Sequence, residues 1–159
     1  MKLRRMVCIV LFSAVVISAV PAESSHGTRV GAGVGIIPKY VLIFRPGKFD
    51  FKGSYDLTEG NEYIYAAAAY RFVNLHNIDG PLHFSIGAGG FGKLYLNNDN
   101  VENMDLIGGV QLPAGLSLLF LDDVLELFVE FAPGVKLNPR PEFDPDNLHI
   151  WAGLTFGMN

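Results

Sequence analysis

Cysteine is almost absent from this chain. Among 159 residues there is one, Cys8, and it lies close to the N-terminus. A disulfide needs two cysteines, so no disulfide can form within the chain. Its folded part has to be stabilised by backbone hydrogen bonds and side-chain packing alone.

Positive charge is scarce after the first five residues. The chain has 12 Lys and Arg residues against 16 Asp and Glu residues, a formal net charge of −4. Lys2, Arg4 and Arg5 supply three of those positive charges. No later segment forms the basic stripe that a nucleic-acid-binding protein needs to neutralise phosphates. A nucleic-acid partner is therefore not expected.

Long apolar runs are also missing, with one exception at the N-terminus. The run from Met6 to Val20 is apolar apart from Ser13 and Ser18, and Val20-Pro21-Ala22 follows it with small residues. This run is shorter than the roughly 20 residues of a membrane-spanning helix. Its basic start and small-residue end are typical of a cleaved signal peptide. We therefore predict a signal peptide over residues 1–22 and one exported domain over residues 23–159.

After residue 27, apolar residues recur at every second position. In the clearest window, residues 105–121, the even positions are apolar or glycine, and the odd positions include Asp105, Gln111 and Ser117. Such alternation indicates a β-strand with one apolar face. The same pattern predicts eight strands, over residues 29–36, 39–45, 48–57, 63–72, 82–93, 105–121, 125–137 and 147–156.

Residues typical of turns separate these segments. Tight turns are predicted around Pro46 and Asp122, with somewhat longer ones at 58–61 and 76–80, and two longer loops at 97–103 and 138–146. Short connections make strands that are neighbours in sequence pair in space. The predicted fold is all-β, an eight-stranded antiparallel up-and-down β-barrel.

The apolar face of such a barrel can point either way. A soluble lipocalin-like barrel points it inward, around an apolar ligand, whereas a transmembrane β-barrel points it outward, against lipid. Here the apolar face lacks charge at the strand centres, and the polar face carries many glycines, which a narrow lumen would explain. We therefore predict a transmembrane barrel with a plugged polar lumen. Its predicted lumen charge network is Arg29, Lys52, Arg71, Lys93, Asp105, Glu126, Glu130 and Lys136.

Two segments carry a family resemblance. Residues 109–116 and 125–134 resemble the small outer-membrane barrels of spirochaetes, and residues 23–159 are more loosely similar to the eight-stranded OmpA/OmpX-type barrels. The resemblance implies a location in the outer membrane of a diderm bacterium, with lipid as a partner and, in some members, contacts with host proteins. One departure is that Gly157, Met158 and Asn159 follow Phe156, whereas many such barrels end on an aromatic residue.

Motifs that suggest chemistry are incomplete. The glycines of residues 87–93 resemble a phosphate-binding loop but continue into a strand, where that loop must open a helix. Glu126 and Glu130 lie about 13 Å apart along a strand, too far for a glycosidase pair. His83, His149, Ser85 and Ser117 share the polar face without the spacing of a catalytic triad. No catalysis, cofactor or metal is expected.

These patterns favour a structural or surface-interaction role. With both termini in the periplasm, the two longer loops fall on the outer side of the membrane. Two alternatives stay open: a host-protein-binding adhesin, and a soluble periplasmic lipocalin-like barrel that binds an apolar ligand. The candidate surface-contact loop comprises Asn138, Arg140, Glu142, Phe143, Asp144 and Asp146.

Overall fold

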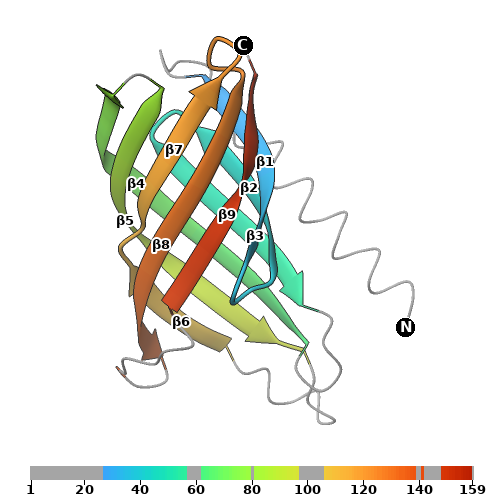
Figure 1. Ribbon diagram of the computed structural model, residues 1–159. Helices are drawn as coiled ribbons and strands as arrows, with labels where there is room; N and C mark the ends of the chain where they lie inside the picture. The colour runs from blue at the N-terminus through green and yellow to red at the C-terminus, as the bar shows by residue number, and fades with distance from the viewer. Residues whose placement is uncertain are drawn as a thin grey trace.

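Nine β-strands account for most of the described chain (Figure 1). The computed structural model describes residues 27–56, 62–79, 81–96, 106–138, 141 and 148–158, with the side chains of 76–79 and 138 left aside. The predicted signal peptide and Asp105 lie outside these residues. The strands are β1 (Thr28–Gly35), β2 (Tyr40–Pro46), β3 (Phe49–Asp56), β4 (Tyr63–Asp79), β5 (Leu82–Tyr95), β6 (Leu106–Gln111), β7 (Ala114–Phe120), β8 (Leu125–Asn138) and β9 (Leu148–Met158).

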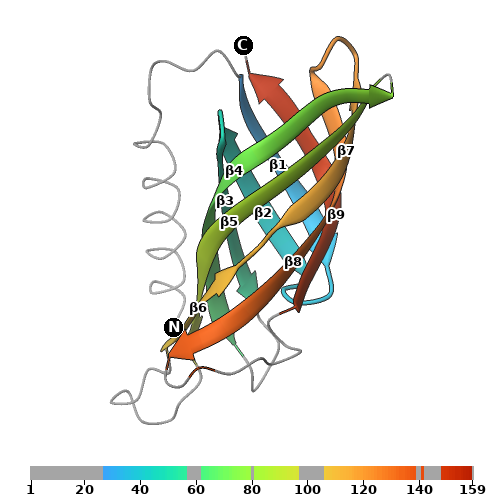
Figure 2. The same ribbon diagram turned by 90° about the vertical axis from the view of Figure 1, so that its left-hand side faces the viewer.

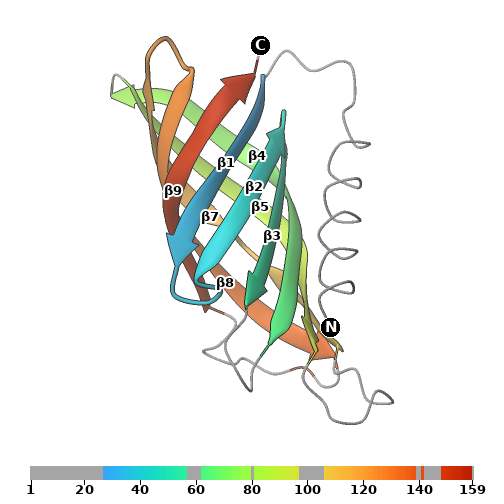
Figure 3. The same cartoon turned by 90° about the vertical axis from the view of Figure 1, so that its right-hand side faces the viewer.

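The sheet closes on itself. Strands that are neighbours in sequence pair antiparallel, and β1 pairs with β9 from Thr28↔Met158 to Gly35↔Trp151. Figure 3 shows these two strands side by side. Strands β6 and β7 share one position, because both pair with β5 and with β8. The fold is therefore a closed eight-stranded antiparallel barrel, which confirms the predicted architecture.

The predicted strand over 105–121 is interrupted at Leu112–Pro113. Its register with β5 is the same on both sides of the break, and β6 continues the line of β7 (Figure 2). Proline has no N–H to donate to a ladder, so the regular pairing stops there. Isolated bonds bridge the gap: Gly87 N–H donates to the carbonyl of Pro113 (2.8 Å), and Leu112 N–H donates to the carbonyl of Pro133 (3.0 Å). The predicted course of this strand is right and its continuity is wrong.

Strand β4 is longer than predicted. The sequence predicted a turn over 76–80, but the backbone stays in β4 as far as Asp79. The β4–β5 register shifts between Arg71 and Val73, which leaves Phe72 as the extra residue of a bulge. A bulge reverses which residues face inward beyond it. As a result Arg71 and then Asn74 face the lumen, while Leu75 is exposed outside.

The two ends of the barrel differ. One end, at the top of Figure 1, carries the start of β1, the end of β9 and the tight turns at 47–48 and 121–124; we call it the terminal end. The opposite end, where the strands flanking 97–105 and 142–147 stop, we call the loop end. The predicted grouping of the tight turns with the termini is confirmed.

The outer face of the strands is apolar, and the charged side chains of the strand centres point inward beside buried hydrophobic residues such as Val41 and Trp151. The exposed outer rows include Leu42 (63% exposed), Leu116 (51%) and Val129 (54%), whereas Arg45 and Asp50 are buried inside. The apolar face therefore points outward, as we predicted from its lack of charged residues at the strand centres. No helix in the described part of the chain is long and apolar enough to cross a membrane.

Glycine on the inner face makes room for aromatic rings and for close strand contact. A Cβ on Gly153 would lie 2.3 Å from the carbonyl oxygen of Ala32 and 2.9 Å from the ring of Phe128. A Cβ on Gly109 would lie 2.6 Å from the ring of Phe91. The glycines of the polar face therefore have a packing reason, as the narrow lumen predicted.

We expect Gly153→Ala to lower the free energy of unfolding by about 1–3 kcal/mol, because the added methyl overpacks the lumen wall. Gly92→Ala is the matched control, since the nearest atom to its Cβ would be 3.9 Å away. Urea titration of both purified variants measures the difference. Equal stabilities would contradict a tightly filled lumen.

Candidate functional site

Arg45 lies at the centre of the lumen and binds three carboxylates. Its Nε donates to Asp50 Oδ2 (3.0 Å), its Nη1 to Glu126 Oε1 (3.1 Å) and its Nη2 to Glu130 Oε2 (3.4 Å). The Arg45 side chain is 4% exposed. A buried guanidinium needs such partners, because removing charge from water without compensation is costly. Arg45 thus links the β2–β3 hairpin to β8 across the barrel.

Lys52 completes a cluster of five charges. Its Nζ lies 2.8 Å from Asp50 Oδ2 and 2.9 Å from Glu130 Oε1. We call Arg45, Asp50, Lys52, Glu126 and Glu130 the charge cluster. Residues two or four apart along a strand share one face, so the tight turn after Arg45 and the spacing in β8 bring these side chains together.

The charge cluster has two further neighbours. Thr155 Oγ1 donates to Glu126 Oε2 (2.6 Å), and Arg29 Nε lies 3.8 Å from the same oxygen. Arg29 also contacts a turn, because its Nη2 donates to the carbonyl of Asp123. Residues 121–123 of this turn all have positive φ. Non-glycine residues rarely adopt that conformation.

The predicted lumen network is only partly one cluster. Lys52, Glu126 and Glu130 belong to the charge cluster and Arg29 touches it, but Lys93 and Lys136 face the lumen nearer the loop end. Asp105 lies outside the described residues. Arg71 lines the terminal end separately.

Sequence reasoning missed the two most connected members of the cluster. Arg45 ends the predicted strand over 39–45 and Asp50 lies in the predicted strand over 48–57, both on the polar face, but neither was included in the predicted lumen network. The available signal was their position on one face of a hairpin, five residues apart around a two-residue turn. Pattern alone shows that these side chains face inward. It does not show which carboxylate across the barrel each one meets.

Aromatic side chains fill the lumen on the side of the charge cluster that faces the loop end. The ring of Trp151 stacks on His149 with centroids 5.2 Å apart, and Tyr65 meets His149 edge-on at 4.9 Å. Arg45 lies 4.5 Å from the Phe128 ring centroid, and Lys52 lies 5.4 Å from that of Trp151. Cation–π contacts of this kind help to stabilise buried charge. We call these rings, together with Phe91, the aromatic plug.

Polar atoms inside the aromatic plug are only partly paired. Tyr65 OH donates to Gln111 Oε1 (3.3 Å), and His149 Nδ1 lies 3.3 Å from the same oxygen. Gln111 Nε2, His149 Nε2 and Trp151 Nε1 are buried without a partner among the described residues. Trp151 was absent from the predicted inner face because an apolar residue on a polar face breaks the alternation.

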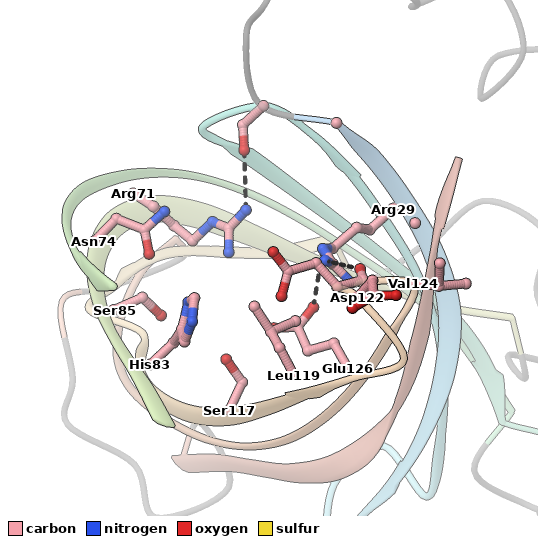
Figure 4. A pocket seen from close by; sticks show the side chains of 14 residues that line it. Arg29, Arg71, Asn74, His83, Ser85, Ser117, Leu119, Asp122, Val124 and Glu126 are labelled. Carbon is pink, nitrogen blue, oxygen red and sulfur yellow. Dashed lines mark hydrogen bonds and ion pairs between the residues drawn. The ribbon is translucent and has the colours of Figure 1, made fainter. Parts of the chain in front are cut away.

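A pocket of about 290 Å³ lies at the terminal end. Its wall includes Arg29, Arg71, His83, Ser85 and Ser117 (Figure 4). His83 is directly opposite Ser117 in the β5–β7 pair. The structure therefore gathers three of the four His and Ser residues considered for catalysis, whereas His149 belongs to the aromatic plug. We call this the terminal pocket.

The predicted surface-contact loop lies mostly outside the described residues. Arg140, Glu142, Phe143, Asp144 and Asp146 are not described, and Asn138 is described only as the last backbone position of β8. Within the described chain, no group of three or more His, Cys, Asp or Glu side chains is arranged to hold a metal ion.

Comparison with known proteins yields no relative. No protein-family model matches the chain, and neither a curated protein nor a solved structure matches it. The resemblance to OmpA/OmpX-type and spirochaete barrels stays a prediction.

We expect Arg45→Met to lower the free energy of unfolding by about 3–5 kcal/mol, because it leaves three carboxylates without their shared cation. Lys39→Met removes an exposed positive charge and should change it by about 0.5 kcal/mol or less. Urea titration compares the two variants. A small effect at Arg45 would mean that water or Lys52 alone compensates the carboxylates.

Proposed function

We propose that the protein is an outer-membrane β-barrel of a diderm bacterium with a structural or surface-interaction role, a plugged lumen and no catalytic activity. The observation that carries this proposal is a closed barrel with an apolar outer face and charges enclosed inside. Lipid accepts only structures whose backbone polar groups are paired internally, and a closed barrel meets that condition.

The extent of the outer apolar surface supports a lipid environment. Leu42, Leu112, Val129 and Leu154 come from four different strand positions around the barrel and are 43–63% exposed. Soluble monomers rarely expose contiguous apolar patches beyond a few hundred Å². Burial in lipid explains why the described outer rows stay uncharged at the strand centres.

Exposed aromatic residues lie towards both ends of the outer rows. Phe120 and Phe156 are on the terminal side, with Phe49 and Phe72, and Tyr40 is on the loop side. Aromatic girdles at the two membrane interfaces are a feature of outer-membrane barrels.

The filled lumen argues against a channel. The charge cluster and the aromatic plug occupy the interior in successive layers, and an eight-stranded barrel is barely wide enough for its own side chains. We therefore expect no steady ion conductance.

The soluble lipocalin-like alternative fits less well. That fold needs an apolar lining around its ligand, and here the inward side chains include Arg45, Lys52 and Glu130. The adhesin alternative depends on the loop at 138–146, most of which is not described.

Membrane fractionation of the exported protein, followed by gel mobility with and without heating, tests the proposal. Recovery in the outer membrane with a heat-modifiable band would support it. Recovery in the soluble periplasmic fraction would overturn it and favour the lipocalin-like alternative.

Orientation in lipid is tested by Leu116→Arg. We expect it to reduce membrane insertion by about 2–4 kcal/mol if the position lies near the bilayer midplane. Leu121→Arg makes the same change in the exposed turn at the terminal end and should insert normally. Folding into vesicles, followed by the heat-modifiable band, measures both. Equal insertion would contradict the proposed lipid contact.

A further inference from the structure

Arg71 differs from the other cations around the charge cluster. Its Nη2 donates to the carbonyl of Gly47 (3.0 Å), and its buried Nε has no partner among the described residues. Arg45 and Lys52 each contact two or more carboxylates, and Arg29 lies near Glu126. No carboxylate of the described chain forms an ion pair with Arg71. Asp50, Glu126 and Glu130 act on Arg71 only from beyond ion-pair distance. A largely buried guanidinium with no carboxylate in direct contact can bind an anion.

The carboxylates nearest to this region are already engaged. Asp50 and Glu130 each contact Arg45 and Lys52. In Glu126, which lines the terminal pocket, Oε1 accepts from Arg45 and Oε2 accepts from Thr155. The two other acids of the pocket wall, Asp122 and Asp123, are exposed in the turn at its rim.

Polar groups line the wall across from Arg71. In Figure 4 the Arg71 guanidinium lies on one side of the open centre, and Ser117 and His83 lie on the other. Asn74 pairs with Ser85 in the β4–β5 ladder, and the bulge at Phe72 is what turns Asn74 inward. Bulges are frequent beside functional sites because they redirect a side chain.

A second guanidinium also has an open donor. Arg29 Nη1 is buried and has no partner among the described residues. The pocket therefore combines two arginine side chains with the Asn74 amide and the hydroxyl groups of Ser85 and Ser117. This is the donor set that binds a carboxylate or phosphate oxygen.

We propose that the terminal pocket binds the oxyanion group, carboxylate or phosphate, of a small molecule. The Arg71 guanidinium is its principal donor, with Asn74 beside it on β4 and Ser85 on the neighbouring strand β5. At about 290 Å³, the pocket is near the lower limit of small-molecule sites. Binding itself does not depend on the proposed membrane location; only the entry of the ligand from the periplasm rests on that proposal.

The test is a titration of the purified full chain, folded in a zwitterionic detergent, with inorganic phosphate and separately with sodium acetate. The NMR signal of the Arg71 Nε–H, assigned by its loss in Arg71→Gln, reports binding at the Arg71 guanidinium. We expect a saturable shift of that signal with at least one anion. Tighter binding of phosphate would indicate a phosphorylated ligand, and tighter binding of acetate would indicate a carboxylic acid.

The anion affinities of three variants distinguish a specific binding site from general electrostatic attraction to a positively charged protein. By isothermal titration calorimetry, Arg71→Gln should bind the preferred anion at least tenfold more weakly. Lys48→Gln, which removes an exposed charge beside Gly47, should bind it like the unchanged protein. Asn74→Leu keeps Arg71 and narrows the pocket, so it should also weaken anion binding at least tenfold. This variant provides the test if Arg71→Gln does not fold.

Two results would overturn the proposal. One is a shift that rises linearly with both anions and never saturates. The other is equal affinity in the unchanged protein and in a folded Arg71→Gln or Asn74→Leu variant. In either case the long-range field of the charge cluster alone would account for the burial of Arg71. A soluble protein in the fractionation experiment would not affect this outcome, because the same titration can be run without detergent.

Discussion

The pairing of β1 with β9 is the constraint on which the rest of this structure depends. It closes the sheet, so that the first and last strands leave no open edge to pair with another chain. It also limits the interior to a width that its own side chains fill. Glycines such as Gly153 follow from that width, because a Cβ there would meet the backbone of β1. No other element of the described chain packs against the outer face, so its apolar rows are exposed.

A narrow interior also explains how the charges are arranged. Charges enclosed in a small space are stable only when each has partners of opposite sign. Arg45 is the positive partner of three carboxylates, and Lys52 is a second positive partner for two of them. The aromatic plug packs beside this cluster and keeps that side of the lumen filled. The charge cluster and the aromatic plug together form a packed interior that contains many charged side chains.

Irregularities in the strands shape the one part of the described lumen where we propose a ligand. The bulge at Phe72 turns Asn74 inward, and the left-handed turn at 121–123 places a carbonyl where Arg29 can donate to it. Both lie at the terminal end. Irregular backbone costs free energy and persists where the surrounding structure holds it. Its position beside Arg71, which forms no ion pair with a described carboxylate, is the reason to look for function at this end as well as in the loops.

The sequence by itself determined the eight strand positions, the antiparallel order and the division of each strand into an apolar and a polar face, because alternation with a period of two depends only on local backbone geometry. It also placed Arg29, Lys52, Glu126 and Glu130 on the inner face. It could not show the break at Pro113 or the extension of β4, since both depend on pairing with neighbouring strands. Only the tertiary structure decided that Arg45 and Asp50 lie at the centre of the charges, that Trp151 points inward and that no described carboxylate forms an ion pair with Arg71. Those contacts join residues up to 85 positions apart, and their meeting depends on the register of the closed barrel.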